Sequence, residues 1–118
     1  MLTKLLRNIA RNKYLIYKED ARRIVFTRLA FFNTHYNLTW RRIAIRDQRS
    51  RWGSCSARGN LNFNYRIALL PPELADYIIV HEMCHLVEMN HGHHFWQIVG
   101  ETIPAWRQRR RALKTIRV

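Results

Sequence analysis

The pattern of apolar and polar positions predicts a helix between Glu19 and Tyr36. Apolar residues recur there every three or four positions, with arginines off the apolar stripe. This spacing places the apolar side chains on one face of an α-helix, and the acids at its start suit the helix dipole. Asn37 tolerates left-handed backbone geometry, so we expect the helix to stop there. The stripe consists of Ala21, Val25, Leu29, Phe32 and Tyr36.

The preceding segment, residues 1–18, holds five lysines and arginines and no acid. Its leucines would share one helical face, but the segment has no acid to balance its charge. We expect it to be a basic leader or linker in front of a folded core at about 19–114.

Alternating apolar and polar residues predict strands at 40–46 and 60–67, with a further short strand at 50–55. A turn signal around Gly59 separates the last two strands, which is typical of a β-hairpin. We therefore expect a small antiparallel sheet.

Pro71 and Pro72 should end the sheet, and Pro72 suits the first position of a helix. A buried helix is expected from there to about Glu88, followed by helices over 93–101 and 104–114. The order helix, strands, helices predicts an α+β domain rather than a parallel βαβ fold.

Length and composition fit one domain with a real core, because the chain has 118 residues of which 47% are hydrophobic. No apolar run approaches the roughly 20 residues of a membrane-spanning helix, so no membrane partner is expected. Cys55 and Cys84 are too few for a disulfide framework. They predict free thiols in a reducing, cytoplasmic compartment, and we expect a monomer.

Charge is distributed unevenly along the chain. The formal net charge is +13, from 21 Lys and Arg against 8 Asp and Glu. Residues 67–103 nevertheless contain no Lys or Arg, while they hold five of the six histidines and five of the eight acids. Because a fixed cation would oppose a divalent metal ion, this stretch is suited to a metal site.

The chemistry is concentrated at residues 81–85, where the sequence HEMCH fits the motif H-E-x-x-H on the predicted buried helix. His81 and His85 are four residues apart and share one helical face, so both can reach one zinc ion. His91 follows as the preferred third ligand. Glu82 is expected to serve as general acid and base towards a water that the zinc activates.

Other residues of the region are alternatives or supports. Glu88 could orient one of the metal ligands without binding the metal itself. His35 is remote in sequence, and we expect it at the surface or at a helix end. The alternatives to His91 as the third ligand are Glu101, His93, His94 and Cys84.

Six blocks of sequence occur together: RWGSCS (51–56), GNL (59–61), NYR (64–66), PP (71–72), DYIIVHEMCHL (76–86) and NHGHHFW (90–96). Together they closely resemble the YgjP-like metallopeptidase domain, a family similar to the SprT and WLM zinc peptidases. The resemblance implies a minimal zincin-like fold in which His81, His85 and His91 hold zinc and Glu82 is catalytic. Members usually carry an N-terminal β-rich region, which we expect to be missing here, so that 1–118 form a single metallopeptidase domain.

The function predicted first is zinc-dependent hydrolysis of a peptide or protein substrate. An extended substrate could add to an exposed sheet edge, and Trp52, Asn64 and Arg66 are candidate substrate-binding residues. A nucleic-acid-binding module with a zinc site is the alternative, because the basic ends could contact phosphates without sequence preference. A nucleotide pyrophosphatase is a third hypothesis, although the chain has no phosphate-cradling Gly-rich loop.

Overall fold

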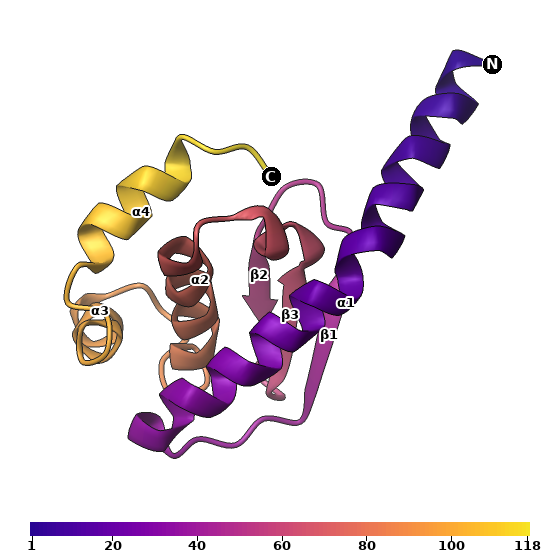
Figure 1. Cartoon of the computed structure of the whole chain (residues 1–118). Coiled ribbons are helices and arrows are strands. Elements are labelled where there is room, and N and C mark those ends of the chain that lie inside the picture. The colour runs from indigo at the N-terminus through magenta and orange to yellow at the C-terminus, as the bar shows by residue number, and fades with distance from the viewer.

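The computed structural model describes all 118 residues and shows an α+β domain (Figure 1). A long helix comes first, three strands and a short 3-10 helix follow, and three helices complete the chain. The elements are α1 (Leu2–Tyr36), β1 (Arg42–Arg46), β2 (Gly53–Cys55), β3 (Asn60–Asn64), η1 (Tyr65–Leu69), α2 (Pro72–Cys84), α3 (His93–Gly100) and α4 (Trp106–Lys114).

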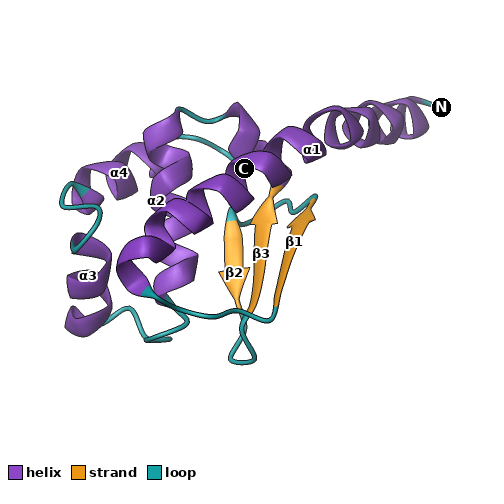
Figure 2. Ribbon diagram, turned by 60° about the horizontal axis from the view of Figure 1, so that its bottom comes forward, coloured by secondary structure: helices purple, strands orange, loops and turns teal.

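The sheet is mixed, with β3 between β1 and β2 (Figure 2). The predicted hairpin is confirmed, because β2 and β3 pair antiparallel around the turn at Gly59. The prediction of a wholly antiparallel sheet is wrong, since β1 pairs parallel with β3. The loop at 47–52 reverses the chain and places β2 one strand position away from β1. The second reversal, at Gly59, returns the chain, so β3 fills the gap between them and runs parallel to β1.

The third strand is shorter than its alternating pattern predicted. It ends at Asn64, and the next five residues form η1. The side-chain oxygen of Asn64 accepts a hydrogen bond from the backbone N–H of Arg66 at 3.0 Å, which caps the new helix. A side-chain cap thus overrides the local alternation.

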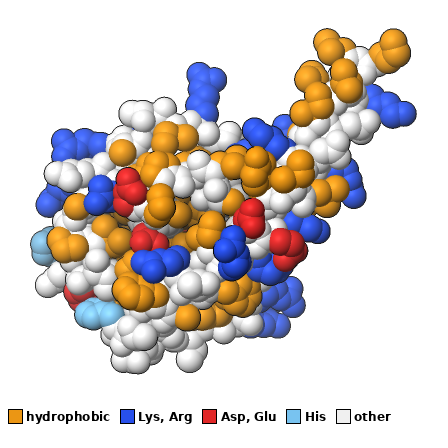
Figure 3. Space-filling view, viewed as in Figure 1, with side chains coloured by type: hydrophobic (Ala, Val, Ile, Leu, Met, Phe, Trp, Pro, Cys, Tyr) orange, Lys and Arg blue, Asp and Glu red, His pale blue; other side chains and the backbone are white.

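Helix α1 begins at Leu2, so residues 2–18 are helical and continuous with the predicted helix. Its first turns project from the body, and apolar side chains cover the projecting part (Figure 3). Leu2, Leu5, Leu6 and Ile9 are each more than half exposed. The helix stops as predicted at Asn37, whose φ of 54° is left-handed. No helix of the structure has both the length and the apolar character needed to cross a bilayer.

The core lies where the second half of α1, the sheet and α2 meet. Helix α2 is buried from Leu74 to its last residue, Cys84, except for the half-buried Asp76 and His81, as its apolar centre predicted. On the α1 side, Tyr14 sets its ring edge-on to Tyr65, with 5.5 Å between centroids. The largest buried side chains include Leu29, Leu61, Phe63, Tyr65, Ile67, Ile79, Met83 and Phe95.

One ion pair ties α1 to α2. The Nε and Nη2 atoms of Arg28 donate to the two carboxylate oxygens of Asp76 at 2.8 and 3.0 Å. Both side chains are partly buried, and a two-point contact of this kind fixes orientation as well as distance. It holds the helix that carries H-E-x-x-H against the longest element of the fold.

We expect Asp76→Ala to lower the free energy of unfolding by about 1–2 kcal/mol, because a partly buried guanidinium loses both of its charge-assisted hydrogen bonds. Asp20→Ala is the matched control, since it removes an exposed ion pair within α1 and should cost less than about 0.5 kcal/mol. Urea unfolding of the two variants measures the difference. Equal losses in the two variants would show that the interhelical pair contributes no more to stability than an exposed ion pair.

Candidate metal centre

Three histidines converge at the C-terminal end of α2. The predicted candidates His81, His85 and His91 each offer a ring nitrogen, and these atoms all lie within 4.8 Å of one another. The Nε2 atoms of His85 and His91 are 2.9 Å apart. His85 is buried, His81 is half-buried and His91 is exposed, so the cluster opens to solvent on one side.

The early end of α2 makes this convergence possible. The helix was expected to reach Glu88, but it stops at Cys84 and His85 stands at its C-cap. The following turn carries the chain back, so that His91 meets the two helical histidines. His91 therefore lies in a loop, and its position depends on where α2 ends.

A backbone carbonyl orients His85. Its Nδ1 atom lies 2.9 Å from the carbonyl oxygen of Glu88. An Nδ1–H donated to that oxygen leaves Nε2 with its lone pair facing the cluster. Glu88 was considered as a support through its side chain, but its carboxylate instead lies 3.7 Å from Nδ1 of His94. The support comes from the backbone, which a pattern of side chains does not reveal.

Aromatic rings of α3 fix the other side of the imidazoles. Phe95 is fully buried and stacks on His85, with 4.4 Å between centroids and 24° between planes. Trp96 lies beside His91 at 6.0 Å and 26°. The sequence motif alone assigned no role to this pair, although both follow His91 closely in the chain.

The environment keeps two of the imidazoles neutral. Burial is the main cause that lowers the pKa of His85, and burial likewise lowers the pKa of His91. The charge of Arg110 on α4 adds to the lowering at His91. Neutral imidazole is the form that binds a metal ion. The cation-free stretch of sequence therefore does not make the surroundings cation-free in space.

Glu82 occupies a tight space between α2 and β2. Its side chain is buried, and its Oε2 atom lies 3.2 Å from Nδ1 of His81. A Cβ atom added to Gly53 would stand 3.0 Å from Cγ of Glu82 and 2.9 Å from the carbonyl oxygen of Asn62. Gly53 thus provides the room for the carboxylate, a role that sequence reasoning did not assign.

The alternative ligands lie elsewhere. Glu101 pairs with His35 at 2.9 Å. Cys84 is buried, and burial raises the pKa of its thiol to about 12. His94 faces Glu88, and His93 lines a separate surface cavity with Trp96. The cluster of three imidazoles, with no fourth protein ligand, fits a metal ion that keeps one position open.

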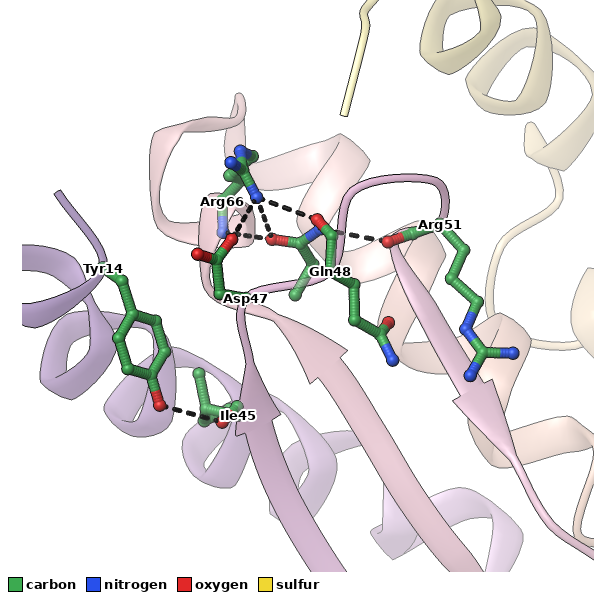
Figure 4. Close-up of polar contacts among 7 residues, drawn as sticks. Tyr14, Ile45, Asp47, Gln48, Arg51 and Arg66 are labelled. Atoms are coloured by element: carbon green, nitrogen blue, oxygen red, sulfur yellow. Dashed lines mark hydrogen bonds and ion pairs between the residues drawn. The ribbon is translucent and has the colours of Figure 1, made fainter. Parts of the chain in front are cut away.

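The predicted substrate-binding residues separate into two groups, and Figure 4 shows the surroundings of one of them, Arg66. Asn64 is fully buried, and its Nδ2 atom donates to the carbonyl oxygens of Gln48 and Arg51 at 2.7 and 3.0 Å. Arg66 donates to Asp47 at 3.0 Å and to the Gln48 carbonyl at 2.9 Å. Asn64 and Arg66 therefore secure the loop before β2, and the structure does not bring them to the histidines.

Trp52 does reach the site. It lines an open cleft of about 270 Å³ together with Gly53, His81 and Glu82. Leu113 of α4 closes the cleft on the other side. A larger cavity of about 550 Å³ lies between α1, η1 and the start of α2, and none of the site residues lines it.

Comparison with known proteins agrees with this geometry. A family model described as "YgjP-like, metallopeptidase domain" matches residues 4–116. Among solved structures, the metallopeptidase zymogen abylysin of Pyrococcus abyssi is 21% identical, with a TM-score of 0.70 over 77% of this chain and 92% of that one. The zymogen jannalysin of Methanocaldococcus jannaschii is 24% identical, with a TM-score of 0.59 over 81% and 97%. None of the curated proteins matches the chain. At these identities the structural matches establish the fold, which is similar to that of minimal zincin metallopeptidases.

Gly53→Ala should destabilise the protein by about 1–3 kcal/mol, because the added methyl group meets both a side chain and a backbone oxygen in a packed region. Gly92→Ala is the control, since no atom lies within 4 Å of the added Cβ, and replacing this N-cap glycine of α3 by alanine should cost about 0.5–1 kcal/mol. Urea unfolding measures both variants. If the two behaved alike, the close approach at Gly53 would not constrain Glu82.

Proposed function

Since the chain belongs to the YgjP-like metallopeptidase domain family, we propose that it hydrolyses peptide bonds with zinc as its metal and Glu82 as general acid and base. The observation that carries the proposal is that His81, which converges with His85 and His91, lines one cleft together with Glu82.

His81, His85 and His91 are the proposed zinc ligands. Bound zinc supplies a Lewis acid that polarises a carbonyl group and lowers the pKa of water towards 7. The chain prepares the ligands in advance: the Glu88 carbonyl fixes the tautomer of His85, and Phe95 fixes the plane of its ring. Two of the imidazoles are already neutral, so little proton release is needed on binding.

Glu82 is the proposed proton carrier. Its carboxylate takes a proton from the attacking water and passes it to the leaving amine. Its position is restricted by α2 on one side and by the close approach of Gly53 on the other. A carboxylate that cannot swing away from the cleft is available for both transfers.

The substrate is proposed to bind as an extended strand along β2. The sheet order leaves β1 and β2 as edges and makes β3 central, so β3 cannot accept another strand. Of the two edges, β2 contributes Gly53 to the cleft. Main-chain hydrogen bonds to β2 would position a peptide without demanding a sequence, and Trp52 would contact its side chains.

Glu82→Gln should leave the fold and zinc binding intact and reduce peptide hydrolysis by about 10²–10⁴-fold, because the amide cannot accept a proton. Cleavage of an unfolded protein is the activity assay, and competition with a coloured chelator measures the zinc. Zinc lost together with activity would make Glu82 a ligand or structural support. Unchanged hydrolysis would contradict the proposed mechanism.

His91→Ala should weaken zinc binding by more than about 100-fold, beyond the usual cost of losing a supporting group around a metal. His35→Ala is the matched control, because His35 pairs with Glu101 and is not part of the cluster. Chelator competition compares the two proteins with the unchanged chain. Full zinc retention in His91→Ala would contradict the third ligand.

A further inference from the structure

The cleft that contains Glu82 has arginines around it. Arg51 lines the cleft beside Trp52, next to the start of β2. Its side chain points away from the cluster formed by Asp47 and Arg66 (Figure 4). On the opposite wall, α4 contributes Leu113, and Arg110 lies one turn earlier on the same helix. Glu82 is the only carboxylate that lines the cleft.

Arg110 is held at the edge of the histidine cluster. Its guanidinium carbon lies 5.3 Å from the centre of the Trp96 ring, and Trp96 lies beside His91. Trp96 in turn stacks on Trp106 of α4, with 4.2 Å between centroids and 14° between planes. A cation against an aromatic face keeps its hydrogen-bond donors free while losing part of its mobility. Arg110 is therefore positioned in advance of any ligand.

No carboxylate of the chain neutralises these arginines. Seven of the eight acids pair with other arginines or with histidines, Glu82 among them through His81, and only Glu73, exposed in the first turn of α2, has no such partner. Arg51 and Arg110 take part in none of these pairs. Arg107, Arg111 and Lys114 of α4, which line a cavity together with Arg110, are unpaired as well.

We propose that the site selects acidic peptides, with Arg51 in the cleft and Arg110 beside the histidine cluster binding Asp or Glu side chains of the substrate. The inference rests on the proposed peptidase function and adds a substrate class to it. Guanidinium groups bind carboxylates through two parallel hydrogen bonds, which gives direction as well as attraction. Unpaired cations around a cleft also raise the local concentration of oppositely charged ligands.

The first test measures binding without cleavage. Two fluorescein-labelled pools of unstructured peptides, one rich in Glu and one rich in Lys, are titrated with the zinc-loaded Glu82→Gln protein, and anisotropy is recorded. The acidic pool should bind about ten-fold more tightly than the basic pool, within the range by which charged clefts concentrate ligands. Equal binding of the two pools would overturn the proposal.

Variants then locate the effect. Arg110→Gln and Arg51→Gln should each weaken binding of the acidic pool several-fold, and Arg110→Glu should shift preference towards the basic pool. Arg7→Gln is the matched control: it removes the same charge from an exposed position of α1, a helix that lines no part of the cleft, and should leave binding unchanged. An equal loss in Arg7→Gln would assign the preference to net charge and overturn the role of the cleft.

Cleavage by the unchanged, zinc-loaded chain separates this proposal from the peptidase function. In a digest of unfolded proteins, Asp and Glu should be enriched beside the cleaved bonds, and Arg110→Gln should raise KM with little change in kcat. Cleavage without that enrichment overturns the acidic preference and leaves the peptidase. Absence of cleavage with Arg110-dependent binding of the acidic pool overturns the peptidase and leaves the acidic cleft. Arg110-dependent binding of a single-stranded oligonucleotide, with no binding of the acidic pool, assigns the surface to nucleic acid and overturns the proposal.

Discussion

The whole site depends on α2 being a buried helix with one polar face. Burial between α1 and β2 holds the helix in place, and the ion pair between Arg28 and Asp76 fixes its position against α1. A buried helix tolerates polar side chains only where they meet one another or an opening. His81, Glu82 and His85 satisfy that requirement, because the two histidines meet His91 and Glu82 lines the cleft beside His81. The packing of the core therefore also holds the site residues of α2 in fixed positions.

A second buried polar group, Asn64, holds the cleft wall in place, as burial holds α2 in place. Its amide nitrogen satisfies two carbonyl groups of the loop before β2, while its amide oxygen caps η1. One side chain thereby fixes both the end of β3 and the start of the wall that carries Trp52 and Gly53. Because the group is fully buried, the loss of any of these bonds would leave an unsatisfied polar atom.

The elements and the site candidates were largely accessible from the sequence, because they depend on local periodicity and on fixed spacing. The stop at Asn37, the hairpin at Gly59 and the meeting of His81 with His85 and His91 are of this kind. The parallel pairing of β1 with β3 was not accessible, since it depends on how a loop crosses the sheet. The roles of Asn64 and the Glu88 carbonyl were missed for a related reason, because their partners are backbone atoms.

The distribution of charge along the sequence differs from its distribution in the folded structure. Along the chain, residues 67–103 exclude every lysine and arginine, which keeps fixed cations away from the immediate neighbours of the three imidazoles. In space, α4 places Arg110 against the ring of Trp96, which lies beside His91. The ring separates two requirements that would otherwise conflict: a metal ion needs ligands free of competing cations, while an acidic substrate would need cations at the mouth of the same cleft. A stacked pair of tryptophans, Trp96 and Trp106, holds that separation in place.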